Sequence, residues 1–195
     1  MPASVFSTNY GPAGYDRTHM FQLGFVAELP GGKNGSGPLN AIVKNWALNG
    51  IFSWVTGAPF TVTASGASVN APGNTQTADL VGTPNKLGGI GPGNPYYDPK
   101  AWAPVTEVRF GNTGRNTVRG PGMKNLDLSL FRRFPIGHKL NLEARVEAFN
   151  VTNTPHFGVP DVSQPDRDVG SAGFMTITGA KGDERQVRLG LRLEF

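Results

Sequence analysis

The sequence predicts an all-β fold of antiparallel strands, and three observations lead to it. Apolar and polar side chains alternate with a period of two in five separate segments, as in strands with one apolar and one polar face. Glycine (27) and proline (16) together make 43 of the 195 residues, which disfavours long helices, and no segment sustains a helical period. Hydrophobic residues at 38% and aromatic residues at 10% supply enough apolar surface to exclude a disordered chain.

The first two predicted strands cover residues 18–29 and 44–56. One face of the first carries Phe21, Leu23, Phe25, Ala27 and Leu29. The opposite face is mostly polar, and a turn rich in glycine and proline follows at residues 30–38. In the second strand one face carries Trp46, Leu48, Gly50, Phe52 and Trp54.

The other three predicted strands cover residues 124–134, 139–150 and 185–195. The first two of these alternate cleanly and are joined by a short turn at residues 135–138. Two long loops separate the strands, at residues 57–122 and 151–184, and both are rich in glycine and proline. The first has little alternation and is expected to be a functional loop or a poorly ordered excursion, whereas the second is expected to hold a minor strand near residues 174–178.

Alternation alone does not say which medium meets the apolar face. In a soluble sandwich that face packs against a second sheet, and in an outer-membrane barrel it meets lipid. Strands of about ten residues suit a tilted bilayer crossing, and short turns alternating with long loops are typical of such barrels. Aromatic side chains also mark the strand ends, where they would lie at headgroup level: Phe21, Trp46, Trp54, Phe134 and Phe195. These features favour an antiparallel transmembrane β-barrel segment.

The last segment carries a candidate assembly signal. Its pattern is a polar residue, a glycine, an apolar residue and a terminal aromatic residue, at Arg188, Gly190, Leu193 and Phe195. This pattern resembles the C-terminal signal that the bacterial barrel-assembly machinery recognises, and an exposed strand edge is a docking template. The alternative is an ordinary edge strand that ends at phenylalanine.

Several motifs are similar to those of the C-terminal barrel of TonB-dependent receptors, in particular the Oar-like group. They are Gly111–Asn116, Arg119–Gly122, Asn125–Leu130, Glu143–Asn150 and Asn153–Phe157, with Asp16-Arg17 and Gly57–Val62 also fitting. The resemblance implies a 22-stranded barrel with an N-terminal plug, which moves ligands across the outer membrane with energy relayed by TonB. Residues 1–195 would then be about five C-terminal strands, without the plug, as a fragment or a truncated gene product. With Phe195 at the periplasmic rim, turns 30–38 and 135–138 are expected to be periplasmic and loops 57–122 and 151–184 extracellular.

Charged residues of the fourth and fifth predicted strands point away from their apolar neighbours. They form a candidate lumen-facing ladder of Glu143, Arg145, Glu147, Arg188, Arg192 and Glu194. Opposite charges on neighbouring strands contribute about 0.2–1 kcal/mol per pair, so the ladder is expected to fix the register. The alternative function is contact with a ligand or with the plug.

The sequence offers little for catalysis, and we expect no enzyme, no cofactor and no metal site. Cysteine is absent, and His19, His138 and His156 lack metal-ligand spacing. The run Gly88–Gly93 is interrupted by proline and is expected to be a flexible loop rather than a phosphate site. Three arginines with an aromatic residue among them are expected to meet lipopolysaccharide or the barrel wall rather than nucleic acid: Arg109, Arg115 and Arg119, with Phe110.

The sequence therefore predicts an outer-membrane transport or receptor protein of a Gram-negative-type bacterium. Its expected partners are outer-membrane lipid, the barrel-assembly machinery and, through the missing N-terminal part, the TonB system; the ligand is unidentified. No signal peptide and no apolar run of about 18 residues are visible. The alternative is a soluble β-sandwich binding module that uses loop 57–122 for recognition.

Overall fold

The computed structural model describes residues 7–29, 44–137, 139–157, 167–182 and 184–195. These residues divide into two compact units. One, which we call the sheet unit, comprises Met20–Trp54, Lys124–Pro155 and Asp183–Phe195; the other, the loop unit, comprises Met1–His19, Val55–Met123 and His156–Gly182. The predicted turn at 30–38 and His138 lie outside the described residues.

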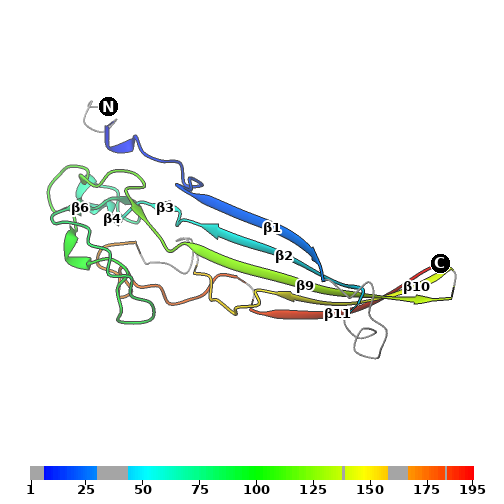
Figure 1. Ribbon diagram of the computed structural model, residues 1–195. Coiled ribbons are helices and arrows are strands. Elements are labelled where there is room, and N and C mark those ends of the chain that lie inside the picture. Colours follow the sequence, from blue (N-terminus) through cyan, green and yellow to red (C-terminus); the bar gives the residue numbers. More distant parts are fainter. Residues whose placement is uncertain (1–6, 30–43, 138, 158–166, 183) are drawn as a thin grey trace. The chain divides into compact units, whose positions relative to one another are not determined.

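The sheet unit contains one five-stranded sheet (Figure 1). In spatial order its strands are β1 (Met20–Glu28), β2 (Trp46–Val55), β9 (Met123–Ile136), β10 (Leu140–Phe149) and β11 (Gln186–Glu194). They fall on the five alternating segments of the sequence, with β9 running two residues beyond its expected end. The pairings of β9 with β10 and of β10 with β11 are antiparallel.

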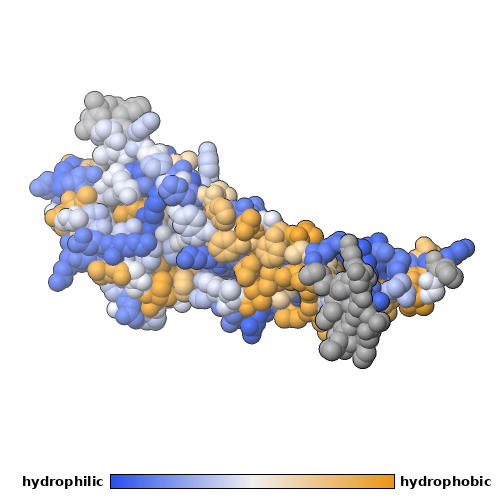
Figure 2. All heavy atoms as spheres, in the orientation of Figure 1, coloured by the Kyte–Doolittle hydropathy of each residue, from blue (hydrophilic) through white to orange (hydrophobic). Residues whose placement is uncertain are grey.

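The apolar side chains of all five strands share one face of this sheet. A Cβ atom placed on Gly50 would overlap the Phe25 ring and lie 2.8 Å from Cδ2 of Leu128, so β1, β2 and β9 meet on the same face. Across β10 and β11 the register continues this face, with Val146 opposite Leu130 on one side and Leu189 on the other. Figure 2 shows hydrophobic residues gathered over the strands.

Within the described part of the sheet unit, no second layer of protein covers the apolar face. On β11, Leu189 and Leu191 are 79% and 76% exposed. A soluble sandwich would bury such side chains between two sheets. The sheet is open, because β1 and β11 each have one neighbouring strand.

Of the two alternatives expected for residues 57–122, a functional loop or a poorly ordered excursion, the structure contradicts the second. The loop unit holds three two-stranded sheets: β3 (Pro59–Phe60) with β8 (Val118–Arg119), β4 (Thr63–Ser65) with β5 (Thr75–Thr77), and β6 (Asp79–Leu80) with β7 (Trp102–Ala103). Two 3₁₀ helices, η1 (Gly66–Val69) and η2 (Pro99–Ala101), lie in the same segment. No helix among the described residues is long and apolar enough to cross a membrane.

The core of the loop unit joins its two long segments. Tyr97 packs edge-to-face against Tyr96 and Trp102, with ring centroids 5.4 and 6.2 Å apart. Met175 and Ile177, which come from the second segment, are fully buried in this cluster. A backbone hydrogen bond also joins the two segments, since the amide of Tyr96 donates to the carbonyl of Met175 at 2.6 Å.

The prediction of a minor strand near residues 174–178 is wrong. Met175 has a positive φ of 61°, which interrupts an extended backbone. In place of a strand, the segment has an isolated bridge between Pro95 and Thr176. Met175 and Ile177 are buried because they enter the core of the loop unit, and Phe174 packs against that core partly buried.

Candidate functional site

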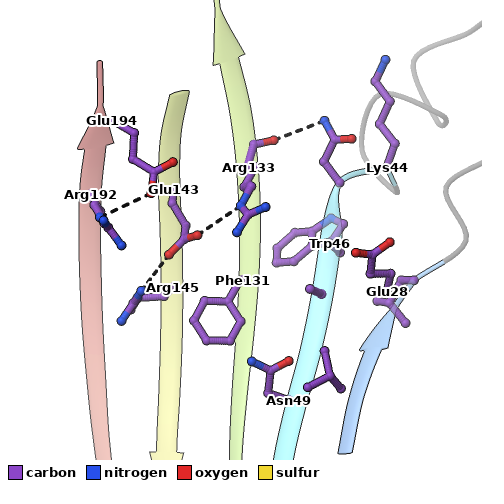
Figure 3. Close-up of a pocket in the computed structure, with 14 residues that line it drawn as sticks. Glu28, Lys44, Trp46, Asn49, Phe131, Arg133, Glu143, Arg145, Arg192 and Glu194 are labelled. Carbon is purple, nitrogen blue, oxygen red and sulfur yellow. Dashed lines mark hydrogen bonds and ion pairs between the residues drawn. The ribbon is translucent and has the colours of Figure 1, made fainter. Parts of the chain in front are cut away.

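The polar face of the sheet unit holds a hollow of about 840 Å³, which we call the groove (Figure 3). All five strands contribute to its lining. On β9, β10 and β11 the lining residues alternate along the strand, as residues on one face of a sheet do. The lining residues are Val26, Glu28, Leu29, Lys44, Asn45, Trp46, Ala47, Asn49, Phe131, Arg133, Glu143, Arg145, Arg192 and Glu194. Seven of them carry charge, four positive and three negative.

Glu143 is the centre of the charge arrangement in the groove. It is only 5% exposed, although its carboxylate is ionic. Arg145 donates to one of its oxygens at 2.7 Å, and Arg133 donates to the other at 3.2 Å. Figure 3 shows the two guanidinium groups approaching this carboxylate from different sides. Two cations therefore compensate one buried anion, as a buried charge requires.

The network extends along β10 toward its C-terminal end. A second nitrogen of Arg145 lies 3.8 Å from Glu147, and the Arg145 guanidinium lies over the Phe131 ring at 5.1 Å from its centroid. Gly190 faces Arg145 in the β10–β11 register, and a Cβ atom there would lie 2.9 Å from Cγ of Arg145. The glycine of the candidate assembly signal therefore leaves room for this arginine.

The six predicted ladder residues lie on one face, but their ion pairs differ from those expected. The register sets Glu143 opposite Arg192 and Glu147 opposite Arg188. The ion pairs of the ladder residues, however, run along β10, along β11 between Arg192 and Glu194 at 3.4 Å, and from Glu143 to Arg133 on β9. The two carboxylate oxygens of Glu143 bond to Arg145 on β10 and to Arg133 on β9, so the network of ion pairs extends from β10 to β9.

Arg133 is the site residue that sequence reasoning missed. It shares the alternation of Asn125, Asp127 and Ser129 in β9, so its place on the polar face was readable from the sequence. Its pairing was not readable, because it depends on the register that sets Arg133 opposite Glu143. Arg188, like Arg145, lies over an aromatic ring: its guanidinium is 4.9 Å from the centroid of the Phe149 ring.

The remaining signal residues lie on the apolar side or at the end of β11. Leu193 faces Leu142 in the register, and Phe195 is 99% exposed just beyond the strand. In the described sheet, β11 pairs with β10 alone and its other edge is open.

Residues of the motifs that carry the family resemblance fix turns and bring backbone segments close to one another. Asp16 forms an ion pair with Arg119, whose guanidinium also donates to the carbonyl of Gly57 at 3.2 Å. Asn150 has a φ of 48°, and its side chain exchanges two hydrogen bonds of 3.0 Å with the backbone of Thr154. These residues therefore shape the connections between strands.

Two of the three arginines expected to meet lipopolysaccharide or the barrel wall form ion pairs within the loop unit. Arg109 donates to both oxygens of Asp79, at 2.8 and 2.7 Å, and also pairs with Glu107. These bonds hold the pKa of Asp79 below its usual value, and they raise the pKa of Arg109. With Arg119 paired to Asp16, two of the three guanidinium groups stabilise the loop unit, and Arg115 is exposed.

The glycine run and the histidines also have structural surroundings. The amides of Gly88 and Gly91 donate to the carbonyls of Tyr96 and Ile177 at 2.9 and 2.8 Å, so the run is bonded into the loop unit rather than a flexible loop. The backbone of His19 exchanges hydrogen bonds with Thr56. Within the described ranges, no group of three or more histidine, aspartate or glutamate side chains could hold a metal ion.

Comparison with known proteins gives one match. A family described as "Outer membrane beta barrel domain" matches residues 2–188. No curated protein and no solved structure matches the chain. The match indicates a location in the bacterial outer membrane. In a barrel of that membrane, the apolar face of an antiparallel sheet meets lipid.

Proposed function

Because the chain belongs to the outer membrane beta barrel domain family, we propose that it forms part of a TonB-dependent receptor that takes up a ligand across the outer membrane. The sheet would supply the last five strands of a 22-stranded barrel, as the resemblance to the Oar-like group implies. The observation that carries this proposal is the arrangement of the motifs. Arg119 bonds both to Asp16 and to Gly57, which lie far from it in the sequence, so these three motifs meet in one place.

The connections of the sheet support a receptor with large external loops. In an antiparallel sheet, the starts of β1, β9 and β11 lie at the same end as the ends of β2 and β10. Residues 57–122 and 151–184 are attached at that end, whereas the link from β9 to β10 at the opposite end is a short turn. Long outer loops and short periplasmic turns are typical of outer-membrane barrels. We propose that the loop unit is extracellular.

The groove is the proposed lining of the ligand path. It offers guanidinium, carboxylate and amide groups together with the Phe131 ring, a set that binds polar ligands through hydrogen bonds and stacking. Arg133, Glu143 and Arg145 already neutralise one another in part, so the groove presents oriented donors rather than one strong charge. In this proposal the chain transports and does not catalyse a reaction.

The other proposed partners follow from the same role. The open edge of β11, with Arg188, Gly190, Leu193 and Phe195, is proposed as the segment that the barrel-assembly machinery binds. The TonB system would act through an N-terminal plug domain. Against the soluble sandwich stand the family match and the uncovered apolar face.

A single cysteine in residues 1–195, which contain none, tests energy-coupled transport. Asn49→Cys, introduced into the gene in its own bacterium, places a thiol in the groove. We expect a membrane-impermeant maleimide to label it faster in cells with an active TonB system than in cells without TonB. Val108→Cys is the matched control, because Val108 is 92% exposed in the loop unit and should be labelled equally in both. Equal labelling of Asn49→Cys in both strains would contradict TonB dependence.

A further inference from the structure

Two guanidinium groups lie on either side of Glu143 in the groove. Arg133 on β9 and Arg192 on β11 are both opposite Glu143 in the register, so the three residues form one row across the sheet. Figure 3 shows the carboxylate of Glu143 between the two guanidinium groups. Neighbouring strands lie about 4.8 Å apart, which places the backbones of the two arginines roughly 10 Å from each other.

Each of these two guanidinium groups has donors to spare. Arg133 donates to Glu143 through its Nε at 3.2 Å, and the Nε of Arg192 lies 3.4 Å from Glu194. Among the described residues, no hydrogen bond engages the terminal nitrogens of either arginine. The side chains of Arg133 and Arg192 are 69% and 64% exposed, so a molecule in the groove can reach them. A guanidinium fork of this kind matches the two oxygens of a carboxylate.

The charges of the row favour an anionic group at each end and none in the middle. The groove lining has four positive and three negative side chains, an excess of one positive charge. A further anion directly beside Glu143 would be repelled by its carboxylate. A ligand with two acidic groups joined by an uncharged spacer fits this distribution. Carboxylates fit it better than phosphates, because each phosphate ester would bring about 1.5–2 negative charges to a lining of small net charge.

We propose that the groove binds a small dicarboxylate, with one carboxylate on Arg133 and the other on Arg192. The hollow of about 840 Å³ has the volume of a small-molecule site, and the Phe131 ring in its lining offers an apolar surface to the spacer. This inference rests on the uptake function proposed above, and it names the chemical class of the ligand.

Arginine modification tests the site in the full-length protein, purified from the outer membrane of its own bacterium. Phenylglyoxal reacts with accessible guanidinium groups, and mass spectrometry measures the rate at each arginine. We expect adipate at ten times its Kd to slow the modification of both Arg133 and Arg192 about tenfold. Arg188 is the internal control, because it is exposed on the polar face of β11 but does not line the groove. Its rate should stay the same.

Other probes test which chemistry the site selects. Hexanoate has the six-carbon chain of adipate with a single carboxylate, and it should protect either arginine much less at the same concentration. Fructose 1,6-bisphosphate presents two phosphates instead. An absence of protection by adipate, equal protection by hexanoate, or protection by the bisphosphate alone overturns the dicarboxylate. If Arg133 and Arg192 are unreactive before any probe is added, another part of the protein covers them, and this result also overturns it.

A pair of variants tests whether the two arginines bind one ligand together. Arg192→Gln retains the ion pair between Arg133 and Glu143. It should reduce the protection of Arg133 by adipate to the level given by hexanoate. Arg132→Gln is the matched control, because it removes an arginine from the opposite face of β9 and should leave the protection complete. Complete protection of Arg133 in Arg192→Gln would contradict binding at two points.

The outcome is separable from that of the uptake proposal, because modification by phenylglyoxal requires neither energy nor TonB. Protection by adipate together with TonB-independent labelling of Asn49→Cys would retain the dicarboxylate site and reject energy-coupled uptake. TonB-dependent labelling of Asn49→Cys without protection by adipate would retain uptake and reject the dicarboxylate.

Discussion

Met175→Ala tests whether the two long segments of the loop unit fold as one body. Met175 is fully buried and belongs to segment 156–182, while most of the core around it belongs to segment 57–122. The substitution removes three heavy atoms from the core without changing the backbone. If the core is shared, both segments lose stability together.

The size of the effect follows from the buried side chain. Three groups at ~0.8 kcal/mol each give a transfer contribution of about 2.4 kcal/mol. A cavity of at most ~70 Å³, at ~24 cal/mol per Å³, adds up to ~1.7 kcal/mol where the core does not collapse. The expected loss is therefore about 2.4–4.1 kcal/mol, a large part of the stability of a small folded unit.

Amide hydrogen exchange of the membrane-inserted chain measures this loss in each segment. The amide of Thr113 reports on the first segment, since it donates to the carbonyl of Ala78, and the amide of Thr176 reports on the second. At tenfold per 1.4 kcal/mol, exchange at both should speed up roughly 50- to 800-fold. Val108→Ala, at an exposed position of the same unit, should change neither. Faster exchange at Thr176 with full protection at Thr113 would refute the shared core.

Two further predictions concern the loop unit and the close backbone approach at Gly57. Hydrogen bonds from Arg109 hold the pKa of Asp79 below its usual 3.8, so the pair stabilises fully above the unfolded-state pKa, and this stability is lost as pH falls through the folded-state value. Asp79→Asn should therefore differ most from the wild type above pH ~5 in exchange measurements. The difference should shrink only as pH falls below 3.8 toward the lowered pKa of Asp79, and a constant difference would contradict the pair. Gly57→Ala places a methyl group in overlap with the carbonyl of Gly120 and should lower the urea midpoint by an amount equivalent to about 1–3 kcal/mol, whereas Gly24→Ala, with open space around it, should leave the midpoint unchanged.

The strands were predictable because each has two different surroundings. Leu189 faces the medium on the apolar side and Arg188 faces the polar side, so apolar and polar residues alternate along the sequence of the strand. The polar face of the sheet, on which the groove lies, was predictable from the same alternation. Which carboxylate each arginine binds did not follow, because that depends on the register and on side-chain reach, as the turn of Glu143 toward Arg133 shows.

The loop unit was not predictable for a different reason. Its strands have two or three residues, too few to display a period. Its core forms between residues far apart in the chain, such as Tyr96 and Met175, and local composition does not record such contacts. Arg109 shows the same limit: it looks like part of a basic patch until its partner Asp79, 30 residues earlier, is known.

The shared core restricts how the proposed receptor opens its outer loops. Thr63 and Val169 are bonded backbone to backbone, and Ile177 is buried among residues of the other segment. A loop that swung away alone would expose Met175 and Ile177 to water and break these hydrogen bonds. Gating by segments 57–122 and 156–182 therefore requires the loop unit to move as one body or to unfold as one body. For the same reason, exchanging one segment for that of a related chain leaves an incomplete core, so in the proposed receptor both segments have to be exchanged together.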